Sequence, residues 1–126
     1  MISAVCLLAA LMLTSAGKND DVMKKENGVY VVNTTTLGKS VIGYDGPTPL
    51  KVYIKGNKIE KIEFLQNQET PKYWKRVADA LLHKWDGMKA QDVKTAEVDG
   101  VTGATYSSDA VKSNVKLAVE YYLKNK

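Results

Sequence analysis

The residues best suited to chemistry lie in one short stretch near the C-terminal end, from Asp99 to Ser108. Its sequence, DGVTGATYSS, combines two glycines with several hydroxyl side chains. Gly100 and Gly103 allow a tight backbone and the close approach of a ligand. A helix is predicted to begin directly afterwards. Its unpaired N–H groups and the positive end of its dipole would suit an anion such as phosphate.

Four hydroxyl side chains could supplement those N–H groups: Thr102, Thr105, Ser107 and Ser108. On the residues alone, an ordinary loop with a serine helix cap is the simpler interpretation, because such loops are common. The stretch is not a Walker loop, since no Lys follows a G-x-x-x-x-G pattern. It also lacks the G-x-G-x-x-G pattern of a dinucleotide fold.

Several predicted strands precede this stretch in the sequence and must help to position it. Residues 29–32 are β-branched and aromatic, and residues 40–44 are a second strand candidate. Apolar and polar residues alternate over 50–55, Gly56 and Asn57 form a turn, and residues 59–65 return as the second strand of a hairpin. Imperfect alternation on the return strand predicts a bulge or twist. Residues 95–98 are a candidate for a further short strand.

Two amphipathic helices are predicted to follow. Thr70 is the expected N-cap of the first, with Pro71 at its first helical position and Gly87 at its end. The second is expected to begin near Ser107 or Ser108, with Asp109 in its first turn. Two apolar stripes would face the sheet: Trp74, Val77, Ala78, Leu81, Leu82 and Trp85 in the first helix, and Val111, Val115, Ala118, Val119 and Tyr122 in the second. The fold class is therefore α+β, a twisted antiparallel sheet with two main helices packed against it.

Composition limits the function further. The 126 residues suffice for one compact domain, and the net charge of +4 is spread along the chain mostly as Lys, which disfavours a nucleic-acid partner. Cys6 and His83 are the only residues of their types, so an Fe–S cluster or a Cys-based zinc site is excluded. We predict no metal site and no catalytic residues, and His83 is expected at the surface.

The N-terminal segment resembles an export signal. Residues 2–13 form an apolar run that is too short to cross a bilayer and has the length of a signal-peptide core. We predict a signal peptide over 1–16, cleaved after Ala16 or retained as an anchor, a polar leader over 17–27 and the functional domain over 28–126. A buried N-terminal helix is the alternative.

The stretch from Asp99 to Thr105 resembles the flavinylation motif of the FMN-binding domain family. That family includes the periplasmic flavoprotein subunits of the Rnf and Na+-translocating NADH:quinone oxidoreductase complexes. Its pattern is Asp, a small residue, any residue, Ser or Thr, Gly, Ala, Thr. In such proteins a flavin transferase joins the FMN phosphate to the last Thr, which corresponds to Thr105.

Two shorter landmarks occur in the same order as in the family. Residues 69–71 resemble the Glu-Thr-Pro that opens the other flavin-side loop, and residues 43–46 resemble an early Gly-Tyr-x-Gly. The resemblance thus spans about 38–122. In the family, Glu-Thr-Pro is usually followed by Gly-Leu-Gly, whereas this chain has Lys-Tyr-Trp at residues 72–74. Tyr73 would therefore replace the Leu that the family places near the isoalloxazine ring. Noncovalent FMN binding therefore stays open beside covalent attachment.

The resemblance implies a set of FMN-binding residues. For two of them, more than one role stays open. Asp99 is recognised by the transferase, or fixes the loop through backbone N–H groups, or forms an Asx turn before Gly100; Glu69 either hydrogen-bonds the flavin or caps local backbone. Tyr106 either shields the phosphate or anchors the loop. The full set is Thr105, Thr102, Gly103, Ala104, Asp99, Ser107, Ser108, Glu69, Thr70 and Tyr73.

The function implied is an exported, extracytoplasmic electron-transfer domain, periplasmic or at the cell surface, with FMN joined through its phosphate to Thr105. It would be an electron carrier rather than a stand-alone enzyme. Its expected partners are a flavin transferase and membrane or extracytoplasmic redox proteins. The alternatives are a small secreted binding module of the same fold without flavin, and the flavin-bearing subunit of an extracytoplasmic reductase.

Overall fold

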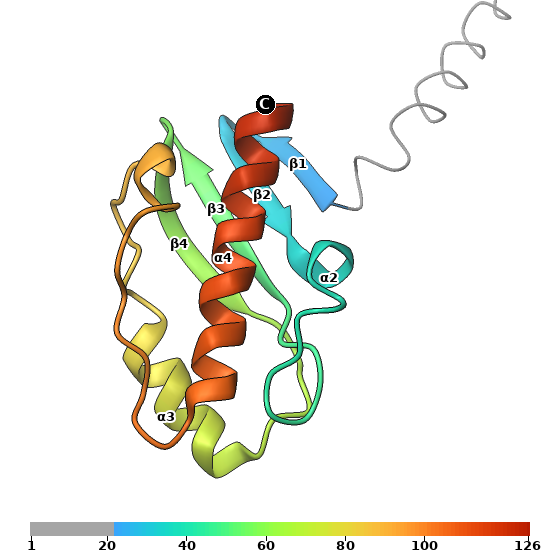
Figure 1. The fold of residues 1–126 in the computed structure, drawn as a ribbon. Helices are drawn as coiled ribbons and strands as arrows, with labels where there is room; N and C mark the ends of the chain where they lie inside the picture. The colour runs from blue at the N-terminus through green and yellow to red at the C-terminus, as the bar shows by residue number, and fades with distance from the viewer. Residues whose placement is uncertain (1–21) are drawn as a thin grey trace, which may run out of the picture.

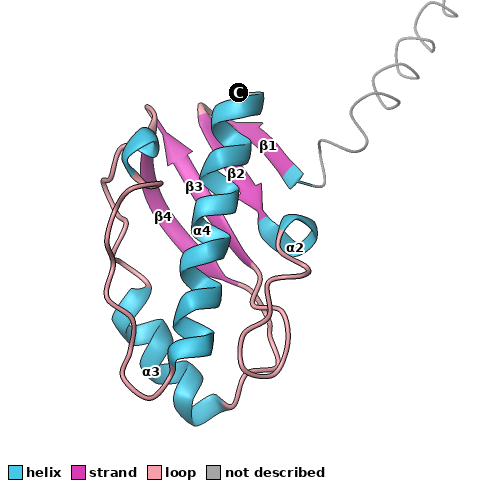
Figure 2. Cartoon of the chain, in the orientation of Figure 1, coloured by secondary structure: helices cyan, strands magenta, loops and turns pink. Residues whose placement is uncertain are grey.

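The computed structural model describes residues 22–126, and the predicted signal peptide and Cys6 lie outside the described residues. Four strands form one antiparallel sheet in the order β1-β2-β3-β4 (Figure 2). A long helix, α4, crosses one face of this sheet, and α3 lies beside its first turns (Figure 1). The α+β class is thereby confirmed. The elements are β1 (Met23–Glu26), β2 (Val29–Asn33), α2 (Thr34–Leu37), β3 (Leu50–Lys55), β4 (Lys58–Phe64), α3 (Pro71–Leu81), the 3-10 turn η1 (Ala90–Asp92) and α4 (Thr105–Asn125).

The core lies between the sheet and α4. Alternate residues of β3 are buried toward the helix: Leu50, Val52 and Ile54. The intervening residues of β3 are not fully buried, as expected for a sheet covered on one side. All five residues of the stripe predicted for α4 are buried. Burial of this apolar surface is the main force that holds the helix on the sheet.

The hairpin of β3 and β4 is confirmed, and so is the predicted irregularity on its return strand. Tyr53 pairs with Lys61 and Ile54 pairs with Ile59, so the register shifts by one residue between them. The backbone of Ile59 also bonds outside the hairpin: its N–H donates to Met88 and its C=O accepts from Gly87. These two bonds attach the segment after α3 to the bulged strand.

Those same bonds explain why α3 ends earlier than expected. The sequence placed its end at Gly87, but the helix ends at Leu81 and turns occupy residues 82–87. Trp85 still reaches the core with 2% of its surface exposed. The backbone of Gly87 is used for pairing with β4 instead of for a helix cap, so the chain must leave the helix before that residue.

Two predicted strands do not form. Residues 40–44 contribute one isolated bridge, between Ile42 and Pro47, and residues 95–98 are not in a strand. The backbone groups are used elsewhere: the N–H of Gly43 donates to Gly46, and the C=O of Val98 accepts from the Lys112 side chain. Three elements were not predicted: β1, α2 and η1. The sheet therefore begins within residues 17–27, which the sequence analysis assigned to the leader.

Candidate functional site

A pocket of about 340 Å³ opens at the end of the molecule where α3 and α4 begin. Three stretches that are distant in sequence build it: the loop before β3, the start of α3 and the start of α4. Its volume lies within the range of small-molecule sites, roughly 300–1,000 Å³. Its lining residues are Tyr44, Glu69, Thr70, Tyr73, Gly103, Ala104, Thr105, Tyr106 and Ser107.

Glu69 joins these stretches. Only 6% of its surface is exposed, and its carboxylate accepts three hydrogen bonds. The Tyr44 N–H donates to Oε1 at 3.2 Å, the Thr48 hydroxyl donates to Oε2 at 3.3 Å, and the Ser107 hydroxyl donates to Oε1 over a short distance. A buried carboxylate needs such partners, because an unpaired one would be costly. These partners are one backbone group, that of Tyr44, and two side-chain hydroxyls, all distant in sequence, so the carboxylate holds the loop before β3 and the first turn of α4 and not its local backbone.

The loop before β3 approaches Glu69 so closely that a side chain does not fit at Gly43. A Cβ there would lie 2.5 Å from Glu69 Oε2 and 2.7 Å from Thr48 Oγ1. Behind this loop, the buried Asn114 side chain donates to the carbonyls of Thr48 and Ala110, at 2.9 and 3.0 Å. The loop is thereby tied to α4 as well as to Glu69.

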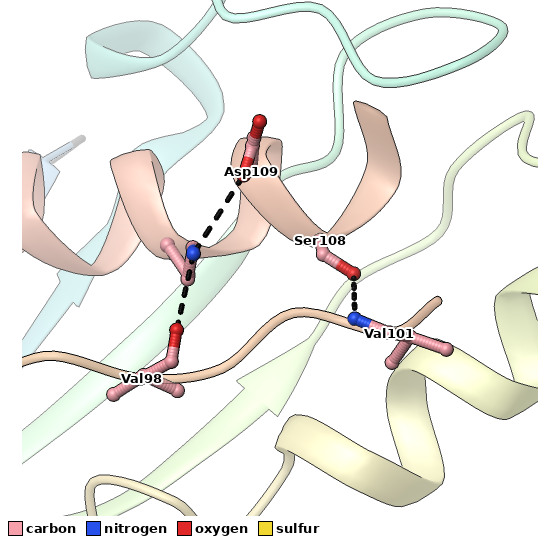
Figure 3. Close-up of polar contacts among 5 residues, drawn as sticks. Val98, Val101, Ser108 and Asp109 are labelled. Carbon is pink, nitrogen blue, oxygen red and sulfur yellow. Dashed lines mark hydrogen bonds and ion pairs between the residues drawn. The ribbon is translucent and has the colours of Figure 1, made fainter. Parts of the chain in front are cut away.

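The turn before α4 has a defined conformation. The N–H of Ala104 donates to the Val101 carbonyl at 2.9 Å, which closes a β-turn. Gly103 occupies its third position with φ +85°, a value that favours glycine there. The Ser108 hydroxyl accepts the N–H of Val101 at 3.0 Å, as Figure 3 shows. That N–H is the group an Asx turn at Asp99 would use, so the Asx interpretation of Asp99 is wrong.

Helix α4 begins two or three residues earlier than the predicted start at Ser107 or Ser108. Thr105 is its first residue, and Ala104 is an N-cap that provides no side-chain hydrogen bond. Ser107 and Ser108 are buried inside the first turn and bond to Glu69 and Val101 instead of capping the helix. The Ser108 N–H donates to the Ala104 carbonyl at 3.0 Å, so the N–H groups that lack a partner within the helix are those of Thr105, Tyr106 and Ser107. Asp109 falls outside the first turn of α4. Its Oδ1 lies 3.7 Å from the Nζ of Lys112, and that ammonium group also donates to the Val98 carbonyl (Figure 3).

Three tyrosines surround the pocket and are largely exposed. Tyr44 is 63%, Tyr106 68% and Tyr73 41% exposed. Each comes from a different one of the three stretches that form the pocket. Exposed aromatic side chains at a pocket indicate a surface for a flat ligand or a partner. The exposure of Tyr106 shows that it does not anchor the loop in the core.

The structure brings together most of the predicted site residues and leaves three outside the pocket lining. Thr105 is exposed at the pocket, so its hydroxyl is accessible. Asp99 and Thr102 are exposed beyond the lining, and Ser108 is fully buried beneath the turn. The Thr70 hydroxyl donates to Asp45 at 3.2 Å and does not cap α3.

Sequence reasoning did not single out Arg76 or Asn114. Arg76 donates to the Thr102 carbonyl at 2.8 Å. It lies off the apolar stripe of α3, where a charged residue is usually only solvated. His83 is exposed as predicted and pairs with Asp86 at 2.8 Å. Within residues 22–126, no group of His, Cys, Asp and Glu side chains could hold a metal ion.

Comparison with known families agrees with this geometry. The model of the FMN-binding domain family matches residues 43–120, more than half of the chain, and covers all three stretches that form the pocket. The chain therefore belongs to the FMN-binding domain family, as its motif indicated. A search of curated proteins found no match.

The pocket fits FMN on the observations above. Two helix N-termini, those of α3 and α4, face it, and their positive ends suit a phosphate. The tyrosines offer aromatic faces to a flat ring system. Thr105 presents an accessible hydroxyl at the helix end, where a phosphate would lie. Membership of the family and the chemistry of the lining thus indicate the same ligand.

Proposed function

We propose that this protein is an exported electron-transfer domain whose FMN is attached through its phosphate to Thr105. The observation that carries the proposal is the accessible Thr105 hydroxyl at the first position of α4, beside a pocket matched by the FMN-binding family. When bound, FMN supplies one- and two-electron transfer. The chain supplies the attachment point, the anion-binding helix ends and the aromatic surroundings.

Attachment would form one bond between Thr105 Oγ1 and the flavin phosphorus and break the phosphoanhydride bond of a flavin dinucleotide donor, whose nucleoside monophosphate leaves with the hydroxyl proton. Relative to the protein and free FMN, the product has lost one water. A threonine hydroxyl is weakly acidic and needs activation by a base or a metal. Among residues 22–126, no side chain is hydrogen-bonded to Thr105, and no group of His, Cys, Asp and Glu side chains could hold a metal ion. A separate flavin transferase is therefore the proposed catalyst of attachment.

Electron transfer requires access to the flavin, and the pocket's open tyrosine rim supports that role. The redox partners would be membrane-bound or extracytoplasmic proteins. Across residues 22–126, the structure contains no helix with the length and apolar character of a membrane span. The apolar run of residues 2–13 is the basis for proposing export.

The test is the intact mass of the protein coexpressed with a flavin transferase. We expect one added FMN less one water in the wild type and in Thr105→Ser, and no addition in Thr105→Ala. Thr95→Ala is the matched control, because this threonine is exposed outside both the motif and the pocket lining, and it should load normally. Loading of Thr105→Ala, or no flavin in the wild type, would contradict the proposal.

A further inference from the structure

Arg76 is the only arginine of the chain and reaches the turn that precedes α4. It lies on the second turn of α3. Its Nη2 donates to the Thr102 carbonyl at 2.8 Å. Its Nη1 lies 3.8 Å from the point where a Cβ on Gly103 would stand, so the absent side chain leaves the guanidinium against the backbone of the turn. Gly103 itself lines the pocket.

The charge of Arg76 is not neutralised within the described part of the chain. A guanidinium has five N–H donors. Among residues 22–126, the bond to Thr102 is the hydrogen bond that Arg76 makes, and it has no acidic partner there. Its neighbour Lys75 differs, because its ammonium group pairs with Asp79 at 2.8 Å. Arg76 is thus a cation with unused donors, held beside the turn that leads to Thr105.

We propose that Arg76 is a phosphate-binding residue of this site, which holds the turn through Thr102 and binds the FMN phosphate with its remaining donors. The planar fork of a guanidinium matches two phosphate oxygens, which a lysine ammonium cannot do in the same way. The inference rests on the proposed function and extends it. Arg76 determines specificity for the phosphorylated flavin, FMN, over riboflavin, which lacks the phosphate.

The first test compares the binding of FMN and riboflavin to the unmodified protein by fluorescence titration. We expect the wild type to bind FMN more tightly than riboflavin. Arg76→Gln should weaken FMN binding roughly 10- to 100-fold, the effect of a lost charge-assisted hydrogen bond, and should weaken riboflavin binding much less, because riboflavin loses only the support of the turn. Arg76→Lys should recover part of the preference. Lys75→Gln removes the same charge from the same helix and should change neither affinity.

A role confined to supporting the turn predicts a different result. Arg76→Gln would then weaken FMN and riboflavin binding equally, and that outcome would overturn the proposal. Unchanged binding of both flavins would overturn it too.

If the unmodified protein binds neither flavin, the test is the 31P NMR spectrum of the flavin-loaded protein. Arg76→Gln should then shift the phosphodiester resonance, and Lys75→Gln should not. An unmoved resonance would overturn the proposal for Arg76 and leave the proposed function intact. A folded wild type that neither binds FMN nor accepts it from a transferase would refute the proposed function itself.

Discussion

Glu69 receives hydrogen bonds from three separate parts of the chain and has almost no contact with solvent. Its donors are the Tyr44 backbone, the Thr48 hydroxyl and the Ser107 hydroxyl. Two of the donor residues line the pocket with it. The carboxylate therefore positions the loop before β3 against the first turn of α4, and the shape of the pocket depends on it.

The first prediction concerns this set of hydrogen bonds. Ser107→Ala should lower the free energy of unfolding by about 1–2 kcal/mol, because one hydrogen bond is lost. Glu69→Ala should lower it by about 2–4 kcal/mol, because buried donors lose their acceptor. In the double variant the loss should be smaller than the sum, since the two side chains interact directly. Urea unfolding measures all three values.

The matched control for this cycle is Ser113→Ala, an exposed serine on the same helix. It should change stability by less than about 0.5 kcal/mol. Additive losses for the Glu69 and Ser107 variants would show that the two side chains do not act together.

Among the secondary-structure elements, the β3–β4 hairpin carries a polar pair on the face of the sheet away from α4. The Tyr53 hydroxyl on β3 donates to Glu63 Oε1 on β4 at 2.7 Å. This hydrogen bond, followed by burial and by the negative charges of Glu63 and Glu26, raises the pKa of Tyr53 from 10.0 to about 12. The fold thus favours the neutral phenol.

The second prediction follows from that pKa. The unfolded chain loses the Tyr53 proton near pH 10 and the folded chain near pH 12, so folding retains the proton between these values. The stability gained from the pair is complete below about pH 10 and is lost as the pH rises to about 12. The stability difference between wild type and Tyr53→Phe should shrink over this window. A difference independent of pH would contradict the assignment.

Local pattern predicted the elements better than their ends. The hairpin and both main helices follow from alternation and helical periodicity within each segment. The ends depend on tertiary partners that no local pattern contains: Gly87 pairs with Ile59, and Ser107 bonds to Glu69. The same holds for the unpredicted β1, a short polar strand that exists through its pairing with β2.

The same distinction between local pattern and tertiary contact applies to the site. The motif ending at Thr105 could be found by resemblance, because its residues are contiguous and of distinctive types. Arg76 could not, because it lies 26 positions from the carbonyl that it contacts. A lone charged residue off an apolar stripe looks like any solvated side chain until the fold shows what it faces.

For the whole molecule, the pocket lies at one end and the core extends away from it. The opposite end has its own connections: the Tyr122 hydroxyl donates to Asn57 at 3.0 Å, and Asn57 donates to Gln91 at 2.8 Å. These contacts join the C-terminal half of α4 to the hairpin turn without involving any pocket residue. Each end of the molecule is therefore held by its own set of contacts, and the two sets share no residue.

This separation leads to a prediction for the flavin-loaded protein. A ligand in the pocket contacts stretches near residues 43–46, 69–73 and 103–107, so it stabilises the arrangement in which all three meet. Hydrogen exchange should slow in these stretches on loading, because their local opening becomes less favourable. Exchange at the hairpin turn and η1 should stay unchanged, since their contacts do not include the pocket. Mass spectrometry of the loaded wild type against unloaded Thr105→Ala measures both regions together. Protection that spreads evenly over the chain, or that is confined to the turn at residues 101–104, would show that the flavin does not join the three stretches.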